Sequence, residues 1–120
     1  MKIGINGYEA VVPRFGYDAK TGLPNRVGSG EVCFQWLHQL SRIDKKNSYK
    51  IFLPVSPTSD LPPESDRWKY EIIKSRRLWT LIGLSRRLAK EKELDVFFTP
   101  THYSPFFASC PQVISILDVS

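Results

Sequence analysis

The sequence predicts an α/β fold of the Rossmann-like kind, in which a mainly parallel sheet is flanked by helices. Apolar residues make up 42% and charged residues 24% of the 120 positions, as in a globular protein with one domain and one core. Short apolar runs alternate with segments whose apolar residues recur at helical spacing, a pattern that favours parallel strands joined by helices. The clearest run, Val96–Thr99, is almost continuously apolar and stops at Pro100, as expected of a strand buried on both faces.

The first half of the chain is expected to contain a strand, a long loop and a helix. Residues 2–7 alternate β-branched with other residues and end at Gly7, a pattern that predicts a short strand. Residues 8–27 show no sustained period and contain two prolines and two glycines, so we expect a loop that is functional or disordered. The helix should begin at the turn formed by Gly28, Ser29 and Gly30. Its expected buried face consists of Cys33, Trp36, Leu37, Leu40 and Ile43.

The rest of the chain is expected to add four further strands, a second helix and a polar loop at residues 56–66. Strands are predicted at residues 50–54, 68–74, 96–99 and 113–117, the first of these completing the N-terminal strand–helix–strand unit. The expected buried face of the second helix consists of Leu78, Leu81, Ile82, Ser85, Leu88 and Ala89. Because strand-to-helix connections of a parallel sheet emerge at one edge, a ligand is expected at the carboxyl ends of the strands.

Several classes of protein are excluded by the composition. Cys33 and Cys110 lie far apart and outside any Cys/His cluster, so we expect buried thiols and neither a disulfide framework nor a metal site. No apolar run approaches the ~20 residues of a membrane span, and no signal peptide precedes the first strand. These features predict a cytoplasmic protein.

A set of short motifs recurs in order along the chain. They are Met1 to Ile5, the Gly28-Ser29-Gly30 turn, Leu78-Trp79, Leu94 to Phe97 leading into Pro100 to Tyr103, and Cys110-Pro111 before Val113 to Asp118. In this ordered set the chain resembles the N-terminal domain of retaining, nucleotide-sugar-dependent glycosyltransferases of the two-domain GT-B architecture (family 4-like). The resemblance implies that residues 1–120 form an incomplete acceptor-side domain, that the C-terminal donor domain is absent, and that the fragment is inactive alone. It implies a nucleotide-sugar co-substrate, an unknown acceptor and no cofactor.

The resemblance also implies a donor-phosphate loop. In that family the segment that corresponds to Gly28, Ser29 and Gly30 lies near the donor diphosphate, where backbone N–H groups and the helix dipole suit an anion. The alternative is an ordinary helix start in which the glycines only permit the turn. The motif is neither a Walker A nor a dinucleotide fingerprint, because it lacks the Lys-Ser/Thr pair and the third glycine.

Two candidate catalytic residues follow from the same resemblance. The family typically carries a His-Asp pair at the end of the last strand, and this chain has Asp118 preceded by Leu117, which cannot transfer a proton. His102, at the end of the neighbouring strand, is the candidate substitute. The alternatives are a loop histidine bonded to backbone for His102 and a capping carboxylate for Asp118.

The remaining expectations concern anions. Arg14 and Arg26 belong to the loop at residues 8–27, which leaves the first strand at the ligand edge. They could therefore contact an anionic acceptor or the diphosphate. The basic residues between Lys74 and Lys92 could touch an anionic membrane, which would place the protein peripherally at the inner membrane face, and the alternative is a solvated polar surface. Nucleic acid is not expected, because the apolar spacing commits this helix to the core.

A second function class stays open on the sequence alone, namely a stand-alone flavodoxin-like binding or regulatory domain that uses the same crevice. The chain lacks the paired acidic cluster of a receiver domain and the hydroxyl- and glycine-rich loop that binds a flavin phosphate.

Overall fold

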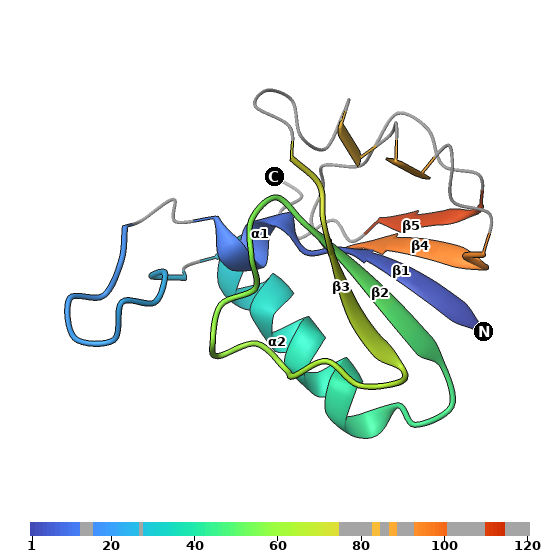
Figure 1. Ribbon diagram of the computed structural model, residues 1–120, viewed down its shortest axis with the longest axis horizontal. Helices are drawn as coiled ribbons and strands as arrows, with labels where there is room; N and C mark the ends of the chain where they lie inside the picture. Colours follow the sequence, from blue (N-terminus) through green and yellow to red (C-terminus); the bar gives the residue numbers. More distant parts are fainter. Residues whose placement is uncertain are drawn as a thin grey trace.

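The computed structural model describes residues 1–12, 16–26, 28–74, 83–84, 87–88, 93–100 and 110–114. Within them the chain forms β1 (Lys2–Asn6), α1 (Tyr8–Val11), α2 (Ser29–Ile43), β2 (Ser48–Leu53), β3 (Trp68–Ile72), β4 (Val96–Thr99) and β5 (Gln112–Ile114). These strands pair in parallel in one sheet of order β3-β2-β1-β4-β5, with α2 along one face (Figure 1). The predicted Rossmann-like α/β fold is therefore confirmed.

The strand order places β1 at the centre of the sheet. From β1 the chain moves outward to β2 and β3, and then returns to the other side of β1 to form β4 and β5. The order in which the chain adds strands thus reverses between β1 and β4, which creates a topological switch point at their carboxyl ends. This is the order of a Rossmann sheet, 3-2-1-4-5, and not the order 2-1-3-4-5 of flavodoxin-like sheets.

Strand positions agree with the prediction more closely than strand ends do. The predicted strand at residues 96–99 coincides with β4, whereas β2 begins two residues earlier than predicted and β3 ends at Ile72. Cross-strand pairing explains the longer β2, because Ser48 and Tyr49 pair with the first residues of β1. β5 begins at Gln112, and the rest of the strand predicted at residues 113–117 lies outside the described residues.

The predicted loop at residues 8–27 contains a helical turn, which is a correction. The amide oxygen of Asn6 accepts a hydrogen bond from the backbone N–H of Tyr8 at 3.1 Å, and α1 follows at once. Four residues are too few to show a helical period in the sequence. Beyond α1, residues 16–26 form a hairpin-like excursion that projects from the body of the protein (Figure 1), closed by the bridge between Tyr17 and Pro24.

Helix α2 begins where the sequence predicts, but its buried face is narrower. Cys33 and Leu37 are fully buried and Leu40 is half-buried, whereas Trp36 is 41% and Ile43 72% exposed. At 100° per residue, Trp36 and Ile43 lie about 60° and 80° from Cys33, on the side away from Leu37. These two residues were therefore wrongly expected in the core.

Two apolar layers enclose the sheet. One lies between the sheet and α2 and includes Ile5, Leu37 and Ile51, and the other lies on the opposite face and consists of Phe52, Leu84, Leu88 and Phe97. Leu88 is buried as predicted, and Leu84, outside the predicted face, is buried too. The other members of that predicted face lie outside the described residues. No helix in the described part of the chain is long and apolar enough to cross a membrane.

Candidate functional site

The switch point brings two buried polar side chains to the carboxyl ends of neighbouring strands. Asn6 ends β1 and Thr99 ends β4, one position beyond the paired residues Ile5 and Phe98. Both side chains are buried, and they share the sheet face of Phe52 and Phe97. Neighbouring polar groups at the carboxyl ends of central strands are where open α/β sheets bind their ligands.

The hydroxyl group of Thr99 is an anomaly at this position. The Thr99 side chain is fully buried, and its Oγ1 atom has no hydrogen-bond partner within the described structure. A buried hydroxyl without a partner costs about 1–3 kcal/mol. Groups of this kind in a native fold call for an explanation, and a ligand hydrogen bond at the switch point is one.

The N-terminus of α2 lies at the same edge of the sheet. The thiol of Cys33 approaches the carbonyl oxygen of Asn6 at 3.8 Å, so the first turns of α2 pack beside the end of β1. Gly28 caps the helix with φ 60° and ψ −123°, a conformation that strongly favours glycine. Gly30 packs against α1, where an added Cβ would meet the carbonyl oxygen of Glu9 at 3.1 Å. Backbone conformation at Gly28 and close packing at Gly30 therefore each account for a glycine without a ligand. Ser29, between them, is the first residue of the helix.

Arg26 is placed close to this edge but binds within the protein. Its Nη1 and Nη2 atoms donate to the two carboxylate oxygens of Asp60 at 2.6 and 3.1 Å, and its Nε donates to the carbonyl oxygen of Ala10 at 2.7 Å. The guanidinium lies 4.1 Å above the centre of the Phe34 ring, and its side chain is only 7% exposed. An anionic ligand would have to displace Asp60 to reach it.

Asp60 fastens the loop between β2 and β3 to α2. Burial alone would raise the pKa of Asp60, but hydrogen bonds from Arg26 and Thr58 outweigh it and hold that pKa below its ordinary value. The ring nitrogen Nε2 of His38 lies 2.6 Å from the carbonyl oxygen of Asp60. Because a carbonyl oxygen only accepts, Nε2 of His38 carries the proton. His38 is thus a structural residue of this loop, in line with the lack of metal-ligand spacing in the sequence.

The thiol of Cys33 is buried as predicted and is not a nucleophile. Burial, and to a smaller extent the negative charge of Glu9, raise its pKa to about 12. Cys110 is half-buried and is not part of a disulfide within the described structure. Across the described ranges no group of three or more His, Cys, Asp or Glu side chains could hold a metal ion.

The other predicted site residues lie outside the described residues, namely Arg14, His102, Leu117 and Asp118. Most of the basic region between Lys74 and Lys92 lies outside them too, but Arg87 is described and forms an ion pair with Glu71 at 2.9 Å. Asn6 and Thr99 were missed by sequence reasoning, although each is the polar last residue of an apolar strand.

Comparison of the chain with protein-family models, with curated proteins and with solved structures finds no match.

Proposed function

We propose that this chain is the acceptor-side half of a retaining GT-B glycosyltransferase that uses a nucleotide-sugar donor. The observation that carries the proposal is the strand order β3-β2-β1-β4-β5, with the Gly28-capped start of α2 beside the end of β1. This arrangement sets a helix N-terminus next to a switch point that carries Asn6 and Thr99. The ordered sequence motifs supply the link to this family.

The chemistry proposed for the site is positioning and charge stabilisation. In the complete enzyme, backbone N–H groups of the turn at Gly28, Ser29 and Gly30 would face the leaving diphosphate, whose negative charge grows as the sugar bond breaks. Asn6 and Thr99 would hold hydroxyl groups of the acceptor on the sugar face from which transfer occurs. Asp118 and His102 remain the proposed catalytic pair, and no cofactor is required.

Arg14 and Arg26 have different places in this proposal. Arg14 stays a candidate contact for an anionic group of either substrate. Arg26 would act indirectly, because its bond to the carbonyl oxygen of Ala10 fixes α1 beside the switch point. The basic region between Lys74 and Lys92 is proposed to meet an anionic membrane surface.

The first test is the coding sequence that follows Ser120. A second α/β domain with a Glu-rich motif, continuous with this chain, is the expected result. The protein encoded by the whole reading frame should then release a nucleoside diphosphate from a nucleotide sugar when an acceptor is supplied. Absence of both the second domain and the release would overturn the proposal.

Thr99 allows a sharper test in that full-length protein. Thr99→Val keeps the shape of the side chain and removes a hydroxyl that has no partner among the described residues, so the free energy of unfolding should be unchanged or slightly higher. Transfer should nevertheless fall, by about 10-fold if one hydrogen bond to the acceptor is lost. Thr58→Val is the matched control, because the Thr58 hydroxyl bonds Asp60 and its loss should lower stability with little effect on transfer. Full activity in a stable Thr99→Val protein would remove Thr99 from the site.

His102→Ala tests the proposed substitute for the family's histidine. Turnover should fall while the midpoint of thermal unfolding stays the same. An unchanged turnover rate would show that His102 has no catalytic role.

A further inference from the structure

A polar pocket lies at the amino-terminal edge of the sheet, where α2 ends and where β2 and β3 begin. It has a volume of about 290 Å³ and lies at the opposite ends of the strands from the switch point. Ser41, Asn47 and Ser65 contribute hydroxyl and amide groups, and the aromatic residues Tyr49 and Trp68 form part of its wall. Its charged lining residues are Asp44, Lys45, Glu64 and Arg67.

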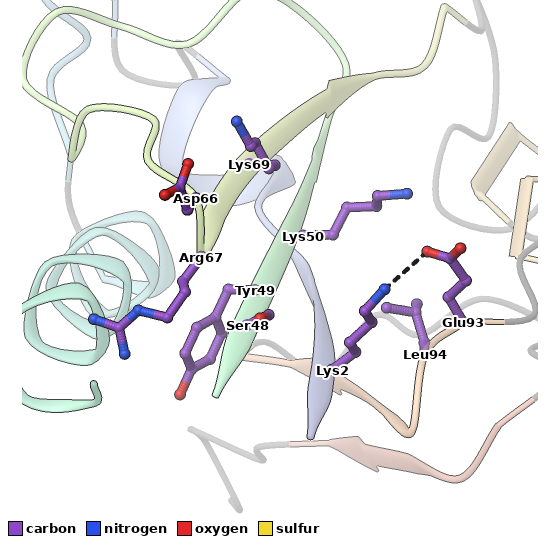
Figure 2. A pocket seen from close by; sticks show the side chains of 9 residues that line it. All are labelled: Lys2, Ser48, Tyr49, Lys50, Asp66, Arg67, Lys69, Glu93 and Leu94. Atoms are coloured by element: carbon purple, nitrogen blue, oxygen red, sulfur yellow. Dashed lines mark hydrogen bonds and ion pairs between the residues drawn. The ribbon is translucent and has the colours of Figure 1, made fainter. Parts of the chain in front are cut away.

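Arg67 is the anomalous residue of this pocket. It also lines the hollow drawn in Figure 2, but its guanidinium turns away from the lysines of that hollow and toward α2. The residue is half-buried and its Nη1 atom is buried, yet in the described ranges the guanidinium forms no hydrogen bond, ion pair or ring contact. Arginine side chains that are withdrawn from water are normally paired, because their N–H donors otherwise lose their bonds to water. An acceptor from outside the protein would supply what the fold does not.

The carboxylate of Asp44 is not available as that acceptor, because the turn after α2 already uses its oxygens. Its Oδ1 atom accepts hydrogen bonds from the backbone N–H groups of Lys46 and Asn47 at 2.9 and 3.1 Å. Its Oδ2 atom accepts from the side-chain amide of Asn47 at 2.7 Å and from the Tyr49 hydroxyl. Two bonds to each oxygen fill the acceptor positions of a carboxylate. These bonds, led by that from Tyr49, hold the pKa of Asp44 well below its usual range, so Asp44 is ionised.

The other two charged residues of the pocket do not pair with Arg67 either. The Nζ atom of Lys45 donates to the carbonyl oxygen of Ser41 at 3.4 Å, and the carbonyl end of a helix is a favourable place for a cation. Glu64 is exposed, and within the described structure its carboxylate forms no ion pair. Arg67 is thus left unpaired in a pocket that two carboxylates line.

We propose that this pocket binds a small zwitterion of the amino-acid type, whose carboxylate Arg67 holds and whose ammonium group lies toward Glu64. A planar guanidinium matches a carboxylate through two parallel hydrogen bonds. The two cationic and two acidic lining residues balance, so a ligand that carries both charges suits the pocket better than a phosphate dianion does. The site is separate from the carboxyl edge and does not depend on the proposed transferase function.

The test titrates γ-aminobutyrate into the isotope-labelled 120-residue chain and follows the Nε–H resonance of Arg67 by NMR. The absence of this resonance from the spectrum of Arg67→Gln assigns it. A saturable shift is expected, together with shifts of the backbone amide resonances of Asn47 and Ser65. Butyrate, which lacks the ammonium group, and inorganic phosphate should each bind at least about fivefold more weakly, because neither carries both charges.

Arg67→Gln should weaken binding of γ-aminobutyrate by about 10-fold or more, since it removes the charged hydrogen-bond donors. The backbone amide resonances measure binding in this variant. Its free energy of unfolding should be unchanged or higher, because the charge that is removed has no partner within the described structure. Arg42→Gln is the matched control, because Arg42 is exposed in the last turn of α2 and does not line the pocket.

Glu64→Gln separates a site for a zwitterion from a general effect of charge. It should weaken binding of γ-aminobutyrate, whose ammonium group loses its partner, and strengthen binding of butyrate, whose carboxylate no longer meets a like charge. Its stability should equal that of the wild type. Equal losses in Arg67→Gln and Arg42→Gln, butyrate or phosphate binding as tight as that of γ-aminobutyrate, or no saturable shift would each overturn the proposal. So would a Glu64→Gln protein that is clearly less stable, because Glu64 would then be the partner of Arg67.

Discussion

At the scale of single residues, Arg26 holds three segments of the chain together. Its guanidinium binds Asp60 in the loop before β3, the backbone of Ala10 in α1, and the face of Phe34 in α2. A planar guanidinium can satisfy a carboxylate with two parallel bonds and still stack on an aromatic ring, which a lysine cannot do. Arg26 thereby connects the end of the projecting 16–26 segment to the body of the protein.

We expect Arg26→Met to lower the free energy of unfolding by about 2–3 kcal/mol, because it leaves the Asp60 carboxylate without its charged partner. Urea unfolding followed by circular dichroism measures the change. Arg42→Met is the control, since Arg42 is exposed in the last turn of α2 and should change stability by less than about 0.5 kcal/mol. Equal effects of the two substitutions would contradict the structural role of Arg26.

The lowered pKa of Asp60 predicts how stability depends on pH. A carboxylate whose pKa is lower in the folded protein stabilises the fold above its unfolded pKa of about 4, and this contribution is lost as the pH falls through the folded pKa. The stability difference between the wild type and Asp60→Asn should therefore be largest near pH 6 and should shrink below about pH 4. Urea unfolding at a series of pH values measures it. A difference that stays constant down to pH 3 would show that the charge of Asp60 is not involved.

At the scale of elements, the start of α2 depends on two glycines for different reasons. Gly28 has a positive φ, so any Cβ there is strained although no atom obstructs it. Gly30 has ordinary helical geometry, but its Cα lies against the backbone of α1. The sequence hypothesis placed Gly30 in a loop near the donor diphosphate, and the packing of α1 against α2 accounts for a glycine there without a ligand.

Gly30→Val should destabilise the protein by about 1–3 kcal/mol through overpacking against Glu9. Gly30→Ala should have a much smaller net effect, because the higher helix propensity of alanine offsets the tight contact. For Gly28→Ala we expect a loss of about 1–3 kcal/mol from backbone strain alone. Thermal unfolding of the three variants tests this order, and a Gly30→Val protein as stable as wild type would show that α1 moves aside freely. Any effect of Gly30→Val on donor use must be corrected for this loss.

The elements that the sequence predicted correctly share a physical cause. Each is a run of apolar residues long enough to show its period, such as the strand at residues 96–99 and the helix at residues 29–43. The turn of α1 escaped prediction because its signal is a side-chain bond from Asn6 to the backbone, which leaves no period. Trp36 and Ile43 were misplaced because spacing gives the direction of a helix face but not the width that the sheet covers.

At the scale of the whole molecule, some apolar side chains on the α2 side of the sheet are exposed near β4 and β5. Val113 is 51% exposed and pairs in register with Phe98, whose ring lies 5.4 Å from the Trp36 ring in an edge-on contact. Exposed apolar side chains that lie close together promote association in water.

We therefore expect the 120-residue chain to bind a hydrophobic dye and to self-associate at high concentration. The double variant Trp36→Gln with Val113→Thr should reduce both effects, as judged by dye fluorescence and by light scattering during size-exclusion chromatography. Ile43→Gln is the control, because Ile43 is exposed at the far end of α2. A monodisperse wild-type monomer without dye fluorescence would refute this expectation.

The sequence predicted at which edge of the sheet the candidate site lies, but not which residues form it. Parallel strands that alternate with helices locate ligands at the carboxyl ends, and the sequence places the Gly28 turn there. Asn6 and Thr99 gain significance only when β1 and β4 become neighbours, which depends on the strand order and on no local pattern. Arg26 was expected to meet an anionic substrate, because a sequence does not show that Asp60, 34 positions later, binds it.

The central position of β1 also bears on how the protein is made. One side of β1 pairs with β2, but its other side pairs with β4, which the ribosome adds only after the whole segment from β2 to residue 96. At typical rates of translation, that edge of β1 stays open for on the order of seconds. An unpaired strand edge can pair with other chains, so the nascent protein passes through a period in which its central strand is open to such pairing. Slower translation between β3 and β4 would lengthen that period. A chaperone that covers β1 would reduce pairing of this strand with other chains.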